Sequence, residues 1–485
     1  SRRAPARSHC RGLEMNYELL FRAGAHAAMR AGNGASAPGT PEVRYALTGA
    51  KGGFARTLLA QTRLMPRLAP TLLCDLDVAG LRALCEELGY PAADLVECST
   101  PDEVAALPQN AIGLIADVAL LDPARYNILV EATGNPSIGY RCARRALQHK
   151  RHVAMVSKEV DAVAGVSLAQ LAAREGVVYT TADGDQPSNL IGWVSWARTL
   201  GLEVVAAGKS SEYDLIFDPA THSVTQLDET FAAPELAGLM KLGDDVRATL
   251  AARRAALNGR KTSATADYCE MAVVATSTDL IPDVELLHYP VARTTELADI
   301  YALQEDGGVL GKRGVIDVFN MLRLPDEASF AGGVFVVVRT HDAPTWALLA
   351  QKGHVVSRNG RYACMYLPYH FMGVETPISL LDAVLHGRPS GAETPRQCTI
   401  LSGRASVDLP AGTVLKMGGH HHDVTGVQAV LIARNDAPRD IAPLYLAAHA
   451  TLARDVKAGV LLSVDDIAGY DAELLSAWQT GFTPA

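Results

Sequence analysis

Short apolar runs alternate with amphipathic stretches along the first part of the chain. "RYALTG" predicts a strand at residues 44–49, residues 55–64 predict a helix, and "TLLCDLD" followed by "LRALCEELG" repeats the order. The runs "NILVEAT", "CARRALQHK", "HVAMVSKE" and "VVYTTADG" continue the series. Apolar strands separated by helices are typical of a parallel sheet covered on both faces. The pattern predicts a doubly wound, Rossmann-type α/β domain over residues 40–200.

The pattern of apolar positions changes after residue 200. "LEVVAAGK", "GGVFVVVRT" and "GHVVSRNGRYACMYLPYH" predict strands of a mixed sheet, and "ATLAARRAALNG" and "PISLLDAVLHG" predict helices. We expect a central α+β domain for substrate binding or oligomerisation over residues 201–395. Short strands with Gly and Pro turns then indicate a small β-rich module over residues 396–485. Residues 1–39 are expected to form an N-terminal arm with one helix.

Charge and composition restrict the class of partner. The formal charge of -9 argues against a nucleic-acid-binding surface, which is usually basic. No apolar run reaches the about 18 residues of a membrane span, and the eight cysteines lack metal-ligand spacing. The basic residues 1–14 have no signal-peptide core; a targeting arm or a non-native extension are the alternatives. We expect a cytoplasmic protein with a small-molecule substrate, and its Ala-rich helices suggest a homodimer or homotetramer.

The turn "TGAKGGFA" follows the first predicted strand. A dinucleotide-binding turn needs three small residues, and alignment on the following helix gives Ala50, Gly52 and Ala55. Ala50 therefore departs from the usual glycine, although Gly49 and Gly53 lie beside these positions. The helix N-terminus would present N–H groups to a phosphate. An ordinary strand-to-helix corner is the alternative for this turn taken alone.

Two later strand ends strengthen the dinucleotide interpretation. "TLLCDLD" ends in Asp75 and Asp77, whose carboxylates could bind ribose hydroxyls and would repel a 2′-phosphate, so NAD is favoured over NADP. The loop in "VEATGNP" would let the nicotinamide half cross the sheet. The predicted cofactor-binding residues are Gly49, Ala50, Lys51, Gly52, Gly53, Phe54, Ala55, Asp75, Asp77, Ala132, Thr133, Gly134 and Ser157.

From "VEATGNPSIGYRCARRALQHKRHVAMVSKEVDAVAG" onward, the sequence resembles the homoserine-dehydrogenase-like oxidoreductases. The resemblance continues through "YTTADGDQPSN", "VVAAGKS", "YCEMAVVATSTDLIPDVELLH" and "YLPYHFMGVETP". It is closest to the subgroup with a C-terminal SAF domain, here "LPAGTVL" with "APLYLAAHATLARDVKAGVLLSVDDI". That subgroup includes the deoxyxylulose-phosphate-reductoisomerase-like (DRL) enzyme. The substrate-binding segment of homoserine dehydrogenases proper has no counterpart in the middle domain.

The resemblance implies an NAD(P)-dependent oxidoreductase that moves a hydride to or from the carbonyl or alcohol carbon of a small polar metabolite. If the reductoisomerase-like relatives are the guide, a rearrangement of a sugar phosphate would precede reduction, and a divalent metal ion would be needed. A non-catalytic nucleotide-binding regulatory protein is the competing class, and Ala50 is the feature that favours it.

Three residues are candidates for proton transfer. Lys158, in "VSKEV", lies where the resembled dehydrogenases place a lysine near nicotinamide, and burial would lower its pKa so that it could exchange a proton. Lys209, in "VVAAGKS", could bind an anion or transfer a proton. His370, in "YLPYHFMG", could be an acid/base group. A surface lysine at a strand end and a structural histidine are the alternatives.

Ionisable residues near these positions are candidates for substrate contact. In "ADGDQP", Asp183 and Asp185 could orient hydroxyls or bind a divalent ion, or they could simply shape a turn. In "GGHHHDV", His420 and His422 would share one strand face, but an exposed loop explains them equally well, so the metal ligands are left open. The predicted substrate-binding residues are Glu159, Asp183, Asp185, Gln186, Glu270, Lys312, Arg313 and Tyr369.

Overall fold

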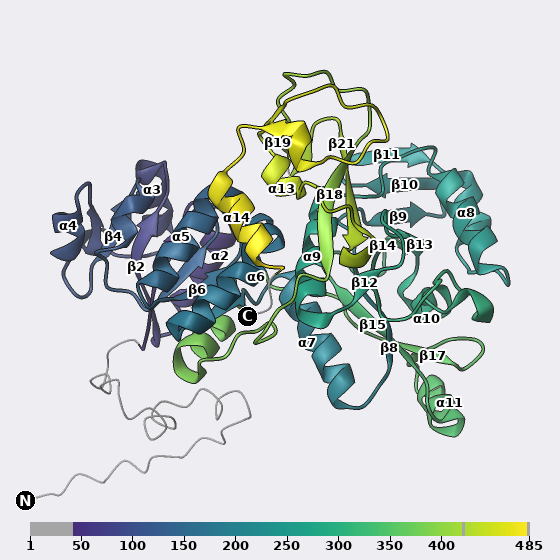
Figure 1. The fold of residues 1–485 in the computed structure, drawn as a ribbon. Helices are drawn as coiled ribbons and strands as arrows, with labels where there is room; N and C mark the ends of the chain where they lie inside the picture. Colours follow the sequence, from purple (N-terminus) through teal and green to yellow (C-terminus); the bar gives the residue numbers. More distant parts are fainter. Residues whose placement is uncertain (1–41, 420–421, 483–485) are drawn as a thin grey trace, which may run out of the picture.

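The computed structural model describes residues 42–419 and 422–482. The expected arm and helix at residues 1–39 lie outside the described residues. Two α/β units lie side by side, and a smaller β-rich part lies above them in the view of Figure 1. The predicted α/β architecture is confirmed by the sheets described below.

The first sheet has seven strands in the order β3-β4-β2-β1-β5-β6-β7, and every pairing is parallel. Its strands are β1 (Val43–Thr48), β2 (Leu68–Cys74), β3 (Leu95–Glu97), β4 (Ile112–Ile115), β5 (Ile128–Glu131), β6 (His152–Met155) and β7 (Tyr179–Thr181). The chain leaves β1 toward β2 on one side and returns to β5 on the other. In such sheets, ligands bind where the strand order reverses, at the carboxyl ends of the strands.

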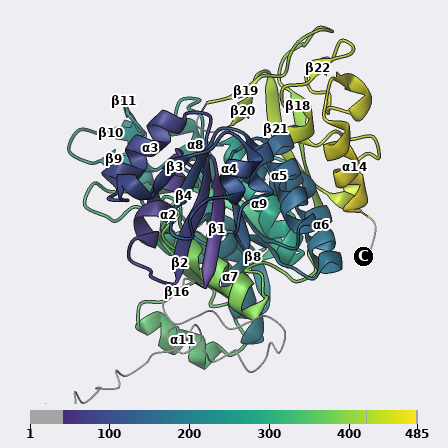
Figure 2. The same ribbon diagram turned by 90° about the vertical axis from the view of Figure 1, so that its left-hand side faces the viewer.

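Helices cover both faces of this sheet, as Figure 2 shows. They are α2 (Gly53–Thr62), α3 (Val78–Glu87), α4 (Pro101–Ala105), α5 (Pro136–Gln148) and α6 (Lys158–Glu175). Successive residues of β1 enter opposite cores: Leu47 packs in the same cluster as Leu58 of α2, whereas Ala46 packs in the cluster of Leu147 of α5. This two-sided burial explains why the strands have apolar runs rather than alternating patterns.

The second sheet has ten strands and is mixed. Its central strand β8 pairs in parallel with β14 and antiparallel with β15. The strands are β8 (Val204–Ser210), β9 (Leu215–Asp218), β10 (Ser223–Gln226), β11 (Glu229–Ala232), β12 (Ile281–Pro282), β13 (Val291–Ala292), β14 (Val315–Arg323), β15 (Val334–Arg339), β16 (Val355–Val356) and β17 (Tyr362–Leu367). The helices of this region are α7 (Gln186–Thr199), α8 (Val246–Ala256), α9 (Thr265–Thr278), α10 (Leu297–Ile300), α11 (Ala343–Gln351) and α12 (Thr376–Leu381).

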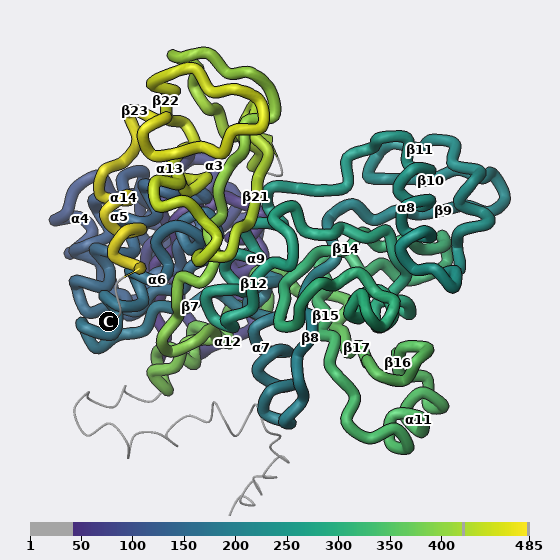
Figure 3. The backbone as a smooth tube through the Cα atoms, turned by 45° about the vertical axis from the view of Figure 1, so that its right-hand side comes forward, coloured from purple at the N-terminus to yellow at the C-terminus, as the bar shows by residue number. Residues whose placement is uncertain are grey.

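The C-terminal part consists of short strand pairs, and Figure 3 shows the long loops of its backbone in yellow-green and yellow. The pairs are β18 (Thr399–Ala405) with β21 (Val427–Ala433), β19 (Met417–Gly418) with β20 (Asp423–Val424), and β22 (Thr451–Leu452) with β23 (Ile467–Ala468). Its helices are α13 (Leu444–Ala447) and α14 (Ala472–Thr480), and α14 packs back on α5 and α6.

Two helices pack across the expected boundaries between the units. Helix α7, whose residues fall in the domain expected over 40–200, packs on β8 and β15 of the second sheet. Helix α12, expected within residues 201–395, places Leu380 and Leu381 in the core around α2. The apolar face of each helix, rather than its place in the sequence, determines its partner. Among the described residues, no helix is long and apolar enough to cross a membrane.

Candidate active site

The glycine turn after β1 has the geometry of a tight, close-packed corner. Gly49 has φ of +62°, and a Cβ added there would lie 2.2 Å from the carbonyl oxygen of Ala132. Only glycine fits such a position. Ala50 is fully buried, and Gly52 donates its N–H to the Gly49 carbonyl at 3.0 Å. The first small residue of the motif was expected at Ala50, and this is corrected: the residue with positive φ is Gly49. The three small positions of the turn are therefore Gly49, Gly52 and Ala55.

Helix α2 begins directly after this turn. Its N-cap is Gly52, which offers no side-chain acceptor, and the first turn carries no acidic residue. The first N–H groups of a helix lack partners within the helix, and the helix dipole is positive at that end. Together with the close approach that Gly53 permits, these groups suit an anionic phosphate.

Asp75 and Asp77 have different roles at the end of β2. Asp75 accepts hydrogen bonds from the backbone N–H groups of Lys51, at 2.9 Å, and Asp77, at 3.1 Å. A carboxylate has about four acceptor sites, so Asp75 can accept further donors. Asp77 caps α3 through the N–H of Gly80 at 2.9 Å. It also pairs with the Lys51 ammonium, which lowers the pKa of Asp77. Asp77 is thus chiefly a helix cap.

The loop after β5 is held by a buried carboxyl group that the sequence did not reveal. Glu131 has no exposed surface and accepts hydrogen bonds from the Thr133 N–H at 3.0 Å, the Thr133 hydroxyl at 2.6 Å and the Thr48 hydroxyl at 3.2 Å. Gly134 donates its N–H to the Ser157 hydroxyl at 2.8 Å. Burial raises the pKa of Glu131. The hydroxyls of Thr133 and Ser157 therefore shape the loop that was expected to receive nicotinamide.

Five ionisable side chains, which we call the ion-pair chain, join the two sheets: Asp185, Lys158, Glu270, Lys209 and Asp267. Lys158, at the start of α6, pairs with Asp185 at 3.5 Å (Nζ to Oδ2) and with Glu270. The second oxygen of Glu270 binds Lys209 of β8, whose Nζ also lies 2.8 Å from Oδ1 of Asp267. The residues come from α6, the N-cap of α7, α9 and β8, so the folding of both units is required to bring them together.

Within the ion-pair chain, exposure decreases from Lys158 toward Asp267. The Lys158 side chain is 24% exposed, whereas Lys209, Asp267 and Glu270 have no exposed surface. The Ser211 hydroxyl, at 2.8 Å, and the Tyr289 hydroxyl, at 3.1 Å, donate to the second oxygen of Asp267. Lys158 is therefore the accessible end of the ion-pair chain, and the buried residues behind it hold it in place. Asp267 was missed by sequence reasoning, although its i, i+3 spacing with Glu270 places both on one helix face.

Charge, rather than burial, decides the protonation of this site. Burial alone would lower the pKa of Lys158, but Asp185 and Glu270 outweigh it and raise that pKa well above its usual value. Burial alone would raise the pKa of Glu270, but the two ammonium groups outweigh it and lower that pKa. The expected lowered lysine pKa is therefore corrected. Lys158 is charged at neutral pH and can donate hydrogen bonds.

Asp183 is bound by hydroxyl groups from separate segments. Ser379 donates to Oδ2 at 2.6 Å and Ser390 at 2.7 Å, while Ser188 donates to Oδ1. These bonds tie the end of β7 to α7, α12 and the segment after α12. Asp183 is thus a structural junction, whereas Asp185 belongs to the ion-pair chain. Gln186, the first residue of α7, is also buried.

The loop at residues 368–375 crosses from the second sheet to the glycine turn. A Cβ at Gly373 would lie 2.1 Å from the Thr57 hydroxyl of α2, so the loop is pressed against that helix. His370 Nδ1 bonds the Gly332 carbonyl at 2.9 Å, and Tyr369 stacks on Phe371. These contacts place His370 and Tyr369 on the loop that packs against α2, and not in the ion-pair chain.

Lys312 and Arg313 lie just before β14, at the opposite end of the parallel strands β8 and β14 from Lys209. Arg313 pairs with Glu203 at 2.9 Å, directly before β8. Lys209 is six residues further along the chain, about 20 Å away at the rise of a strand. The two basic residues are therefore not brought to the ion-pair chain, because β8 and β14 run parallel and separate their beginnings from their ends.

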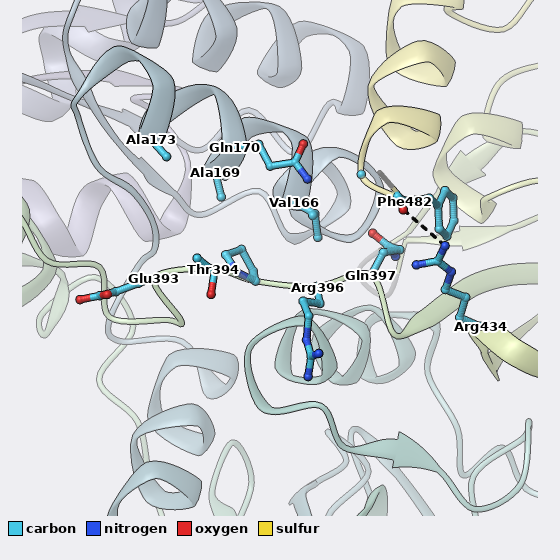
Figure 4. A pocket seen from close by; sticks show the side chains of 12 residues that line it. Val166, Ala169, Gln170, Ala173, Glu393, Thr394, Arg396, Gln397, Arg434 and Phe482 are labelled. Carbon is cyan, nitrogen blue, oxygen red and sulfur yellow. Dashed lines mark hydrogen bonds between the residues drawn. The ribbon is translucent and has the colours of Figure 1, made fainter. Parts of the chain in front are cut away.

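A cavity of about 350 Å³ lies along the second half of α6 (Figure 4). Val166, Ala169 and Ala173 of α6 line it, with the segment at residues 393–397 and Phe482. Ala169 is eleven residues beyond Lys158, roughly 16 Å along a helix. This cavity is not part of the site at the strand ends.

The carboxylates of the ion-pair chain do not suit a divalent metal ion. Both oxygens of Glu270 already bind lysine ammonium groups, which would repel a second cation. Among the residues that the structure describes, no three His, Cys, Asp or Glu side chains are arranged to hold a metal ion. His420 lies outside the described residues, and His422 binds Glu159 instead.

Comparison with known proteins supports an oxidoreductase. Residues 184–376 match the family described as "Oxidoreductase DRL, catalytic domain". This segment contains Asp185 and the five residues of the second unit that build or support the buried end of the site: Lys209, Ser211, Asp267, Glu270 and Tyr289. No match was found among the curated proteins.

Solved structures resemble parts of the chain at low identity. The WlbA dehydrogenase from Bordetella pertussis, in complex with NADH and UDP-GlcNAcA, is 16% identical with a TM-score of 0.26, over 36% of this chain and 47% of that one. A probable dehydrogenase from Thermotoga maritima is 12% identical with a TM-score of 0.36, over 72% and 91%. A DOX-P reductoisomerase in complex with magnesium is 18% identical with a TM-score of 0.26, over 35% and 46%. The chain thus spans less than half the length of the first of these relatives, and the scores are too low to assign an activity.

Proposed function

We propose that this protein is an NAD(P)-dependent oxidoreductase that transfers a hydride to or from the carbonyl or alcohol carbon of a small polar metabolite. The observation that carries the proposal is a charged, partly exposed Lys158 fixed between Asp185 and Glu270 at the strand ends of a parallel sheet. The glycine turn of the same sheet supports a bound dinucleotide, and the family match supports oxidoreductase chemistry.

The adenosine end of the cofactor would lie at the end of β2. Asp75 keeps acceptor sites for ribose hydroxyls, and Leu76, 92% exposed beside it, offers an apolar surface for the base. Asp75 favours NAD. The ammonium of Lys51, paired with Asp77, brings a positive charge that could accept a 2′-phosphate, so NADP is the alternative.

The residues of the chain would act on the substrate oxygen. When bound, a nicotinamide dinucleotide supplies or accepts the hydride. As a carbonyl carbon gains a hydride, negative charge develops on its oxygen, and the Lys158 ammonium would stabilise that charge. Asp185 and Glu270 orient the ammonium. Lys209, itself paired with Asp267, holds Glu270 from behind, so that the donor is fixed before the substrate arrives.

A reductoisomerase acting on a deoxyxylulose-5-phosphate-like sugar phosphate is the second candidate, because the matched family is DRL. The lysines on Glu270 argue against a metal-dependent rearrangement at this position. The proposal has three further parts. The substrate resembles that of homoserine dehydrogenases, the C-terminal module is SAF-like, and the protein forms a homodimer or homotetramer. The catalytic class is preferred to a regulatory protein because ionisable groups converge at Lys158.

Calorimetric titration with NADH and NADPH tests the cofactor first. We expect micromolar binding of one of them, weakened at least tenfold by Asp75→Ala and unchanged by Asp228→Ala, an exposed control in the second unit. Homoserine, hydroxy acids and sugar phosphates are then assayed as substrates, with and without Mg²⁺. Turnover without Mg²⁺ supports simple hydride transfer; turnover confined to deoxyxylulose 5-phosphate with Mg²⁺ supports the second candidate. If neither cofactor binds, the proposal fails.

A further inference from the structure

The C-terminal module places one histidine beside the expected nicotinamide loop. His422 Nδ1 bonds Oε1 of Glu159, the second residue of α6, and a Cβ at Gly134 would lie 3.8 Å from His422 Cε1. The next residue, Asp423, is anchored at 2.6 Å to the hydroxyl of Thr265, where α9 begins. His422 is thus held through Glu159, the neighbour of Lys158, and through Asp423, which is bound to the start of α9.

The pairing with Glu159 determines which ring nitrogen of His422 is available. Glu159 is buried, and an ionised carboxylate can only accept hydrogen bonds, so Nδ1 carries the hydrogen. In the neutral imidazole, Nε2 then has a free lone pair. A carboxylate that fixes the tautomer and orientation of an imidazole in this way is the arrangement used in hydrolytic triads. The His422 side chain is 37% exposed, so it can reach a ligand.

Hydride transfer requires a second group that exchanges a proton near neutral pH. Lys158 keeps its proton because its pKa is raised, and Glu270 stays ionised because its pKa is lowered. The pKa of His422 is raised from its ordinary value by the hydrogen bond to Glu159, against the opposing effects of burial and of Lys158. Glu212, which follows β8, also raises it. Among these groups, only His422 is an imidazole, the side chain that ordinarily exchanges a proton near neutral pH.

We propose that His422 takes the hydroxyl proton when the substrate is oxidised and returns it when the carbonyl is reduced, with Glu159 as its positioning residue. During oxidation, the O–H bond breaks and its electron pair forms the second C–O bond. The hydrogen on carbon leaves with its electron pair to the nicotinamide ring, and the imidazolium then releases the proton to water. Lys158 only stabilises the oxygen. This inference rests on the proposed function.

Proton NMR of the full chain with NADH tests the proposal without a known substrate. The Cε1–H signal of His422 is assigned by its loss in His422→Asn, with His354→Asn, an exposed histidine, as the matched control. We expect a cross-peak between this proton and the nicotinamide ring of bound NADH, and a lower His422 pKa in Glu159→Gln. NADH bound without the cross-peak overturns the role of His422 but leaves the proposed function standing. Failure of NADH to bind in the unmodified chain overturns both.

Kinetics with a substrate found in the assays above give a second readout. His422→Asn should bind NADH within about twofold of the unmodified chain and lower kcat by roughly 100-fold or more, the usual contribution of general acid–base catalysis. The limb of the pH–rate profile that reports His422 should disappear with it. An unchanged kcat and pH profile would overturn the proposal, while His354→Asn should behave like the unmodified chain.

Discussion

Glu270→Gln is the most informative perturbation of the ion-pair chain. Glu270 has no exposed surface, and each of its oxygens binds a lysine ammonium. Glutamine has nearly the same shape, but its amide nitrogen is a donor and would face one of the ammonium groups. The substitution therefore removes the negative charge from between Lys158 and Lys209 without creating a cavity.

The expected loss of stability follows from the burial of the partners. Removing one member of a buried ion pair costs about 3–5 kcal/mol, because the remaining charge is left uncompensated. Lys209 keeps Asp267 at 2.8 Å, and Lys158 is partly exposed and keeps Asp185. These remaining partners reduce the penalty, so we expect the lower end of that range, about 3 kcal/mol.

Urea unfolding followed by circular dichroism measures this loss. The matched control is Glu473→Gln, because Glu473 pairs with Arg144 at 3.5 Å while 51% exposed, and such surface pairs contribute below about 1 kcal/mol. If Glu270→Gln lowers the unfolding free energy of the unmodified chain by no more than Glu473→Gln does, the account of a buried, ionised network is refuted.

Three further changes test separate parts of the structure. Gly49→Ala should abolish NADH binding and destabilise the protein, because the added Cβ meets the Ala132 carbonyl. The control is Gly176→Ala, where φ is +70° but the space is open; it should lower the unfolding free energy by only about 1 kcal/mol and leave NADH binding intact. Calorimetry measures the binding and urea unfolding measures the stability. Burial raises the pKa of Asp161 to about 6. The folded protein therefore holds a proton that the unfolded chain releases near pH 4, so this group lowers stability by roughly 3 kcal/mol as pH rises from about 4 to 6. Asp161→Asn should remove that decrease in urea unfolding across this range. Lys158→Met should lower kcat by roughly 100-fold or more in the oxidoreductase assay and leave NADH affinity within about twofold, since a transition-state donor is lost.

Most of the first sheet could be predicted from the sequence because its signal is local: apolar runs alternate with amphipathic helices. The edge strand β3 has only three residues and ends in Glu97, so it was not predicted. The glycine turn was placed one residue late, because the sequence shows which residues are small but not which of them has positive φ or approaches Ala132.

The charged site could be predicted only in part. Lys158, Lys209 and Glu270 were each singled out, but the sequence could not show that one carboxylate binds both lysines, since Lys158 and Glu270 are 112 residues apart. Without that contact, burial alone was considered and the pKa of Lys158 was expected to fall. His422 was missed as a partner of Glu159 for the same reason: the contact spans 263 residues and joins separate units.

A crystal structure of the protein with NADH tests the central claim most directly. The account predicts the pyrophosphate at the turn of Gly49 and Gly52, the adenosine ribose on Asp75, and the nicotinamide ring at the loop of Gly134, facing Lys158. A dinucleotide bound elsewhere, such as in the cavity along the second half of α6, would contradict the account.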